Sequence, residues 1–242
     1  MLTVIQSNET PQQASKYALK NSVVKKLQNL LPEQWEITGG LSCSTKMPGF
    51  SISTPASACI AGSKLAEVKG SVCNGCYAKR GNYPYQTVQN ALRQRMYSLN
   101  NPLWIPSMVA LITKGCELIN ESYFRWFDSG DLQGIWNLQN IVEVCKLTPR
   151  IKHWLPTREY KMVNDYQKEF GNFPDNLIVR ASAHMIDGEA PKDFEHTSTV
   201  SRLYSAKDKQ GILCEAYTRE NSCGNCRSCW DKDVKDITYH KH

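Results

Sequence analysis

Seven of the ten cysteines in this 242-residue chain fall into two groups with the spacing of metal ligands. In the first group, Cys73 and Cys76 are separated by two residues in VKGSVCNGCYAKRGNYP, and Cys59 precedes them. Two thiolates at this spacing can bind one metal centre. A [4Fe–4S] cube held by only three thiolates keeps one iron open for chemistry. Cys43, in a loop rich in glycine and serine, is a candidate fourth ligand.

The second group lies near the C-terminus in LCEAYTRENSCGNCRSCWDK and has the spacing Cys-x8-Cys-x2-Cys-x2-Cys. Zinc sites usually take two separated pairs of ligands. Three cysteines in tandem are instead typical of the sequence run that holds a [4Fe–4S] cluster. We therefore expect an iron–sulfur cluster here, with zinc as the alternative. The four expected ligands are Cys214, Cys223, Cys226 and Cys229.

The composition indicates a globular protein, because 41% of the residues are hydrophobic and 10% are aromatic. The net charge of +6 is mild and the basic residues are scattered, so nucleic acid is neither indicated nor excluded as a partner. The N-terminus does not resemble a signal peptide, and no segment has the roughly 20 apolar residues that span a bilayer. We expect a cytoplasmic protein with reduced thiols and no membrane partner.

Hydrophobic periodicity predicts alternating strands and helices, which favours an α/β fold with a parallel sheet. Strands are expected at 67–73, 122–127, 151–155, 176–181, 197–204 and 209–214, and helices at 10–31, 85–99, 105–120, 135–146 and 159–170. Residues 38–66 are expected to form a loop. The pattern predicts a partial (β/α) barrel of about six parallel strands. Three segments are expected: an N-terminal helix and loop (1–66), the partial barrel (67–213) and a Cys-rich C-terminal extension (214–242).

Polar residues follow three of the predicted strands, at the point where each strand ends, and Cys73 and Cys76 stand at the end of a fourth. The carboxyl ends of parallel strands share one face, which carries the active site in barrels and open α/β sheets. We therefore expect these residues to lie together with Cys73 and Cys76. They are Asp128, Ser129, Gly130, Asp131, Thr157, Arg158, Glu159, Ser182 and His184.

Three cysteines followed directly by an aromatic residue, Tyr77, form a pattern that resembles the radical S-adenosylmethionine (SAM) superfamily. The usual pattern of that superfamily is Cys-x3-Cys-x2-Cys with an aromatic residue next to the last cysteine. This chain departs from that pattern, with 13 residues between Cys59 and Cys73. Residues 43 to 240 more closely resemble a phage family, gene product eighty-eight. The resemblance is carried by KMPGFSISTPASAC, CNGCYAKRGNY, FRWFDSGDLQ, HWLPTRE and CGNCRSCW. It implies a phage protein in the host cytoplasm, with a radical-SAM-like partial barrel and at least one iron–sulfur cluster.

The superfamily resemblance also implies residue roles. Cys59, Cys73 and Cys76 would hold a [4Fe–4S] cluster that binds SAM, with Tyr77 beside it. The segment 129–132, which includes Ser129 and Gly130, takes the place of the glycine-rich strand end near the methionine amino group.

For the remaining polar residues, the resemblance implies contacts with SAM itself. Asp128 or Asp131 would meet the SAM ammonium, Arg158 its carboxylate and Glu159 a ribose hydroxyl. The C-terminal cluster would be auxiliary, feeding electrons or binding substrate.

Two alternatives remain open at this stage. The chain could be a non-catalytic iron–sulfur protein that serves as a redox sensor or a binding module. It could instead be a zinc-stabilised nucleic-acid-binding protein, because YAKRGNYPYQ places aromatic residues among basic ones. The substrate is not indicated by the sequence, and an enzyme of this kind would also need an electron donor.

Overall fold

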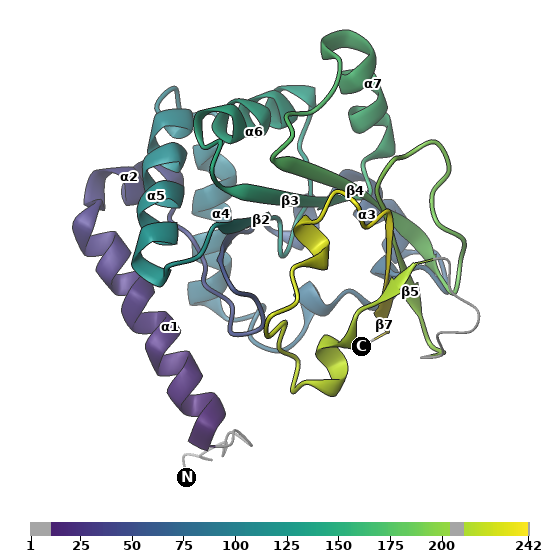
Figure 1. Cartoon of the computed structure of the whole chain (residues 1–242), viewed down its shortest axis with the longest axis horizontal. Coiled ribbons are helices and arrows are strands. Elements are labelled where there is room, and N and C mark those ends of the chain that lie inside the picture. The colour runs from purple at the N-terminus through teal and green to yellow at the C-terminus, as the bar shows by residue number, and fades with distance from the viewer. Residues whose placement is uncertain (1–10, 204–210, 242) are drawn as a thin grey trace.

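The computed structural model describes residues 11–203 and 211–241, with the side chains of 11–17 left aside. Its centre is a sheet of seven strands in which every neighbouring pair is parallel (Figure 1). The spatial order is β1-β2-β3-β4-β5-β7-β6. The strands are β1 (Phe50–Ile52), β2 (Tyr123–Trp126), β3 (Lys152–Thr157), β4 (Leu177–Ile186), β5 (Thr197–Ser201), β6 (Ile212–Leu213) and β7 (Asp236–His240).

Seven α-helices lie in the described part of the chain, and several end where the sequence predicts an ending. Helix α7 stops at Gly171, which has a φ of +84° that favours glycine. Helix α5 ends at Asn120 in the left-handed conformation. The helices are α1 (Pro11–Leu30), α2 (Pro32–Thr38), α3 (Ile60–Ala66), α4 (Gln86–Ser98), α5 (Trp104–Ile119), α6 (Ile135–Leu147) and α7 (Tyr160–Phe170).

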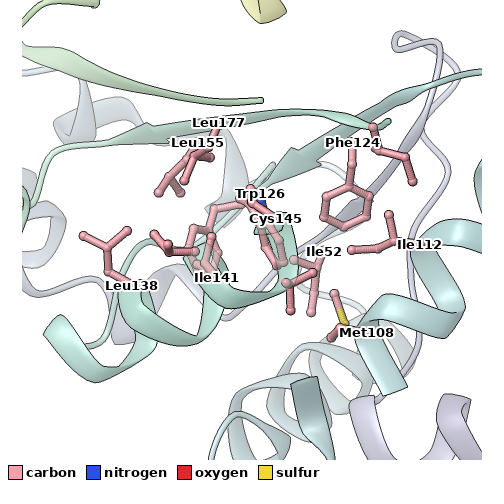
Figure 2. Close-up of a cluster of buried hydrophobic side chains, with 14 of the residues drawn as sticks. Ile52, Met108, Ile112, Phe124, Trp126, Leu138, Ile141, Cys145, Leu155 and Leu177 are labelled. Carbon is pink, nitrogen blue, oxygen red and sulfur yellow. The ribbon is translucent and has the colours of Figure 1, made fainter. Parts of the chain in front are cut away.

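The main hydrophobic core lies between the sheet and the helices that connect its strands (Figure 2). Alternate residues of β2, Phe124 and Trp126, are fully buried in it. Cys145 of α6 lies in the same cluster, and Cys116 of α5 is also buried there. Both cysteines therefore pack as small hydrophobic residues.

A smaller cluster occupies the opposite face of the sheet and is built around the C-terminal segment. Trp230 lies 5.2 Å from the Trp154 ring of β3 and 5.5 Å from the Tyr123 ring of β2, measured between ring centroids. Met47 completes the buried part of this cluster. The Cys-rich segment is therefore packed on the sheet face that the core helices leave uncovered.

The α/β class with a parallel sheet is confirmed, and most predicted elements are present. Strands β2 to β6 and helices α1, α4, α5, α6 and α7 coincide with predicted segments. Thr10, Tyr204, Lys209 and Gln210, at the ends of three predicted elements, lie outside the described residues. Strands β1 and β6 each pair with one neighbour, so the described sheet has two open edges.

Two predictions about the first 80 residues are wrong. Segment 67–73 is not a strand of the sheet: Gly70 has a φ of +87°, and only Ser71 makes an isolated antiparallel bridge, to Met185. Segment 38–66 is not only loop, since it contains β1 and α3. The first sheet strand is thus β1, which at three residues is too short to show a periodicity.

The three predicted segments share one sheet. Strand β1 comes from the first segment and β7 from the third, and both pair with strands of the middle segment. In the part of the chain that the structure describes, no helix is both long and apolar enough to cross a membrane.

Candidate functional site

The first cysteine group lies in the connection that follows β1. Cys59 immediately precedes α3, and Cys73 begins a short 3-10 turn, Cys73–Gly75, that ends before Cys76. The position of a Cβ on Gly62 would be 3.6 Å from Sγ of Cys59 and 3.7 Å from Sγ of Cys73. Helix α3 therefore closes the 13-residue gap in the sequence and directs both sulfurs toward the same space.

The loop that carries Cys73 is held from two sides. Ser71 donates its hydroxyl to the carbonyl of Leu65 and accepts a hydrogen bond from Asn74 N at 3.0 Å. On the other side, Val72 N donates to the carbonyl of His184 at 2.9 Å. The end of β4 thus supports the loop, although β4 begins about 100 residues later in the chain.

Burial raises the pKa of the Cys59 thiol to about 12, and the charges of Asp131, Cys73 and Cys76 act in the same direction. Burial also raises the pKa of Cys73, but the positive charge of Arg158 opposes it. The charges of two carboxylates, Asp131 and Glu159, and of one guanidinium, Arg158, therefore act on this group of thiols. A bound metal centre would have to displace the thiol protons, as metal binding to cysteine generally does.

Glu159 and Gln133 connect the strand ends to the chain around Cys59. The carboxylate of Glu159 accepts a hydrogen bond from Ala61 N at 2.7 Å. Gln133 donates its amide nitrogen to Ala58 O at 3.3 Å and to Asp131 O at 2.8 Å. The residues on both sides of Cys59 are thereby fixed to the carboxyl ends of β2 and β3.

Asp131 is buried and accepts three hydrogen bonds. Its Oδ1 accepts from Leu132 N at 2.8 Å and from the Thr157 hydroxyl at 2.6 Å, while its Oδ2 accepts from Arg158 N at 2.9 Å. Burial raises the pKa of Asp131 to about 6, against the effect of these hydrogen bonds. The carboxylate joins the ends of β2 and β3 next to the cysteine group.

Asp128, Ser129 and Gly130 connect the end of β2 to β1. Ser53 donates its hydroxyl to the Asp128 carboxylate, and the Ser129 hydroxyl donates to Thr54 O at 3.1 Å. A Cβ on Gly130 would lie only 1.9 Å from Thr54 Oγ1, and the φ of Gly130 is +82°. Glycine is therefore required at this position because no side chain fits between the two strand ends.

Arg158 lies between the first cysteine group and the end of β4. Its Nε donates to Ala183 O at 3.3 Å. The neighbouring Tyr160 donates its hydroxyl to Ser182 O at 2.5 Å and stacks on the His184 ring at 4.3 Å between centroids. The expected meeting of polar residues at the carboxyl edge of the sheet is thus observed for β2, β3 and β4.

Tyr77, directly after Cys76, turns toward the same edge. Its hydroxyl donates to the backbone carbonyl of Asp128, and the residue as a whole is 51% exposed. The Tyr83 ring lies against it, with the centroids 6.0 Å apart.

The second cysteine group lies on the other side of the sheet from the core helices. Burial raises the pKa of Cys229 to about 12, and the negative charges of Cys214 and Cys223 act in the same direction. A hydrogen bond with the Tyr239 hydroxyl at 3.2 Å opposes this shift. Burial acts to raise the pKa of Cys226, but its hydrogen bonds with Ser228 and the positive charge of Arg219 together lower it.

Arg180 holds the backbone of the C-terminal segment in place. It is fully buried on β4 and donates to six carbonyl oxygens at 2.7–3.3 Å. The Trp230 ring nitrogen adds a bond to Phe124 O at 2.8 Å. The alternation in NLIVRA places Arg180 on the face opposite Val179, but nothing in the sequence shows what it binds. The six acceptors are the carbonyls of Thr197, Ser228, Cys229, Asp231, Val234 and Lys235.

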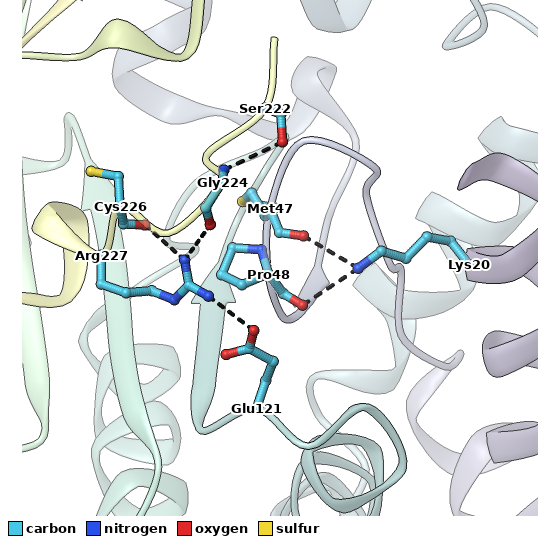
Figure 3. A network of polar contacts seen from close by, with 8 residues as sticks. All are labelled: Lys20, Met47, Pro48, Glu121, Ser222, Gly224, Cys226 and Arg227. Atoms are coloured by element: carbon cyan, nitrogen blue, oxygen red, sulfur yellow. Dashed lines mark hydrogen bonds and ion pairs between the residues drawn. The ribbon is translucent and has the colours of Figure 1, made fainter. Parts of the chain in front are cut away.

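The loop of the second group is also tied to the start of β2 (Figure 3). Arg227 forms an ion pair with Glu121 at 2.9 Å and donates to Gly224 O at 2.6 Å and to Cys226 O at 3.0 Å. Lys20 of α1 donates to the carbonyls of Met47 and Pro48 in the adjacent loop, at 3.3 and 3.4 Å.

Arg125 of β2 connects the surroundings of the two groups and was missed in the sequence. Its guanidinium lies 4.5 Å from the centroid of Trp154, and its Nη1 is 3.4 Å from the Met47 sulfur. The charges of Tyr77 and Asp128 on one side and of Tyr239 and Cys229 on the other raise its pKa, against the effect of burial. The signal that could have found it is the alternation in FRWF, which places one arginine opposite two buried aromatic residues.

Cys43 precedes β1 and is partly buried. It packs against the main core, and burial raises its pKa while the nearby Lys20 opposes the shift. Within residues 11–203 and 211–241, no three His, Cys, Asp or Glu side chains are arranged around one point as ligands of a single metal ion.

Comparison with curated proteins and with solved structures gave no significant match. A family model described as gene product 88 matches residues 2–232, nearly the whole chain. The match includes both cysteine groups and all the strand ends described above. The chain therefore belongs to the gene product 88 family.

Proposed function

We propose that this chain is a phage iron–sulfur protein of the radical-SAM type, acting in the host cytoplasm. The observation that carries the proposal is the convergence of Cys59 and Cys73 on the space beside Gly62, at the carboxyl edge of a parallel sheet. Cys76 directly follows the turn that Cys73 begins. In this proposal, the open seven-stranded sheet corresponds to the partial (β/α) barrel of that superfamily.

The donor set suits the proposed cluster. The three thiols are soft ligands of the kind that selects iron–sulfur clusters or zinc. The surroundings are polar but well ordered, since Glu159 and Gln133 fix the chain on both sides of Cys59. Such hydrogen bonds outside the ligand shell hold metal ligands in place in known metal sites.

When bound together, the cluster and SAM supply a one-electron cleavage of SAM and hydrogen abstraction from a substrate. The protein residues would bind and orient. Arg158, whose charge acts on Cys73, would bind the SAM carboxylate. Asp131, whose charge acts on Cys59, would attract the ammonium.

Other residues at the edge would bind the rest of SAM. Glu159 would accept a hydrogen bond from a ribose hydroxyl, since within residues 11–203 and 211–241 only the carboxylate oxygen that binds Ala61 N has a partner. The backbone of Ser129 and Gly130 and the half-exposed Tyr77 would contact the cofactor.

Cys214, Cys223, Cys226 and Cys229 would hold a second, auxiliary [4Fe–4S] cluster that passes electrons from a donor protein. Their segment is anchored by Arg180 and Trp230, so its position relative to the sheet is firmly set. Arg125 lies between the surroundings of the two groups, and the charges of Tyr77 on one side and Cys229 on the other act on it.

One observation favours a second candidate, a non-catalytic iron–sulfur protein. The carboxylate of Asp131 accepts three hydrogen bonds from the chain, from Leu132, Thr157 and Arg158. In this reading the carboxylate has the structural role of joining the ends of two strands. The same cluster would then act in redox sensing or in binding a partner.

The test is anaerobic purification of the whole chain, followed by iron, sulfide and zinc analysis and by absorption and electron spin resonance spectra with and without SAM. About eight irons per chain, with a spectrum that SAM perturbs, supports the enzyme. The same iron content with no response to SAM supports the non-catalytic protein. Zinc without iron contradicts both and favours the zinc-stabilised nucleic-acid-binding protein.

A further inference from the structure

A pocket of about 370 Å³ opens on the side of Asp128 that faces helix α4. Ligand pockets span about 300 to 1,000 Å³, so this one suits a small molecule. Most of its lining side chains are polar, and they come from three separate parts of the chain. They include Ser42, Ser53, Asn82, Tyr83, Thr87, Arg95 and Asp128.

The pocket holds one buried cation. Arg95 is 7% exposed, and it donates through Nε to Gly39 O at 3.1 Å and through Nη1 to the Ser42 hydroxyl at 2.9 Å. Within the described residues, its Nη2 has no hydrogen-bond partner. Burial lowers the pKa of Arg95, and the negative charge of Asp128 opposes that shift.

The pocket also holds one carboxylate. Asp128 accepts a hydrogen bond from Ser53, and burial raises its pKa although Arg125 and Arg95 oppose the shift. Among the described residues, neither Arg95 nor Asp128 has an ion-pair partner within 4.0 Å. The two charges thus act on each other across the pocket without making contact.

Unpaired charges in a poorly solvated site are costly, and an oppositely charged partner reduces that cost. A molecule that carries an anion at one end and a cation at the other would pair both residues at once. We propose that this pocket binds a free α-amino acid, with its carboxylate on Arg95 and its ammonium on Asp128. This site needs neither cysteine group, so it goes beyond the function proposed above.

The test uses the whole chain, purified anaerobically, and measures its melting temperature with each standard α-amino acid at millimolar concentration. We expect at least one of them to raise Tm by about 3 °C or more. The same compound without its carboxylate, or without its amine, should give a much smaller rise. The proposal would be overturned if the compound without its carboxylate, or the one without its amine, raised Tm as much as the amino acid does. It would also be overturned if no amino acid raised Tm.

Two variants make the assignment specific. Asp128→Asn keeps the shape and the acceptor for Ser53 but removes the charge, so it should abolish the ligand-induced rise. Without ligand, its Tm should equal or exceed that of the wild type, because an unpaired charge is gone. The control Asp165→Asn, on the exposed face of α7, should behave like the wild type. A ligand-induced rise that persists in Asp128→Asn, or a lowered Tm of that variant, would show that Asp128 is only a structural partner of Arg95.

Discussion

Glu159, at the end of β3, accepts a hydrogen bond at 2.7 Å from the backbone nitrogen of Ala61, two residues after Cys59. The two residues are 98 positions apart in the chain. This contact fixes the first turn of α3, and hence Cys59, to the sheet. A carboxylate that accepts from a backbone N–H makes a charge-assisted bond, which is stronger than a neutral one. The first cysteine group therefore depends on a residue of a strand end far away in the sequence.

Glu159→Ala should weaken the first proposed cluster and leave the second unchanged. Loss of the hydrogen bond leaves Ala61 N without its partner, a cost of about 1–3 kcal/mol. We expect the iron content after anaerobic purification to fall by about half. Glu159→Gln, which keeps an acceptor oxygen, should retain most of the iron. Equal iron in Glu159→Ala and the wild type would contradict the role of this contact.

Gly130→Ala should destabilise the chain by more than about 3 kcal/mol. The new methyl group would meet Thr54 Oγ1 and its carbonyl at 1.9 and 2.7 Å, in a backbone conformation with positive φ. Gly81 also has a positive φ but has nothing within 4 Å of its Cβ position. Gly81→Ala should therefore cost only about 1–2 kcal/mol. Urea unfolding of both variants measures the difference, and equal costs would show that the strand ends can move apart.

Arg180→Lys should cost more than about 3 kcal/mol, because a lysine cannot reach six carbonyl oxygens and leaves most of them unpaired. The control is Arg202→Lys, at an exposed ion pair with Asp187, which should change stability by no more than about 1 kcal/mol. Urea unfolding of the metal-free chain tests both. A small effect of Arg180→Lys would mean that the C-terminal segment is held by other contacts.

His153 should make the chain lose stability in acid. It is fully buried among aromatic residues, and burial lowers its pKa from 6.5 to about 3. The unfolded chain therefore takes up a proton at a pH where the folded chain does not. The contribution of the neutral His153 to the free energy of unfolding is fully present above pH 6.5. It is lost as the pH falls toward 3, and the loss amounts to at most about 4 kcal/mol.

The variant His153→Phe tests this pH dependence. It keeps an aromatic ring against Trp126, whose centroid is 5.9 Å away, and removes the titrating group. We expect its free energy of unfolding, measured with urea between about pH 7 and about pH 4, to fall less steeply than that of the wild type. Identical slopes would assign the acid loss to other groups.

The regular elements were predictable because each has a local pattern. The alternation of SYFRWF and the helical spacing from Ile105 to Ile119 reflect one buried face each, which a short window of sequence reveals. Strand β1 has only three residues, and β7 is a short strand at the C-terminal end of a segment dominated by cysteines. In such segments the neighbours in the sheet, rather than the local sequence, decide the structure.

The sequence by itself determined the parallel α/β class, the two cysteine groups and the edge at which polar residues of β2, β3 and β4 meet. These follow from residue types and spacing, since side chains alternate along a strand and parallel strands end on one side. Only the tertiary structure decided how the 13-residue gap before Cys73 is closed, and that Arg180 holds the second group. Both rest on contacts between distant segments, Ala61 with Glu159 and β4 with residues 228–235. No local pattern encodes such contacts, because they form only when the whole sheet has assembled.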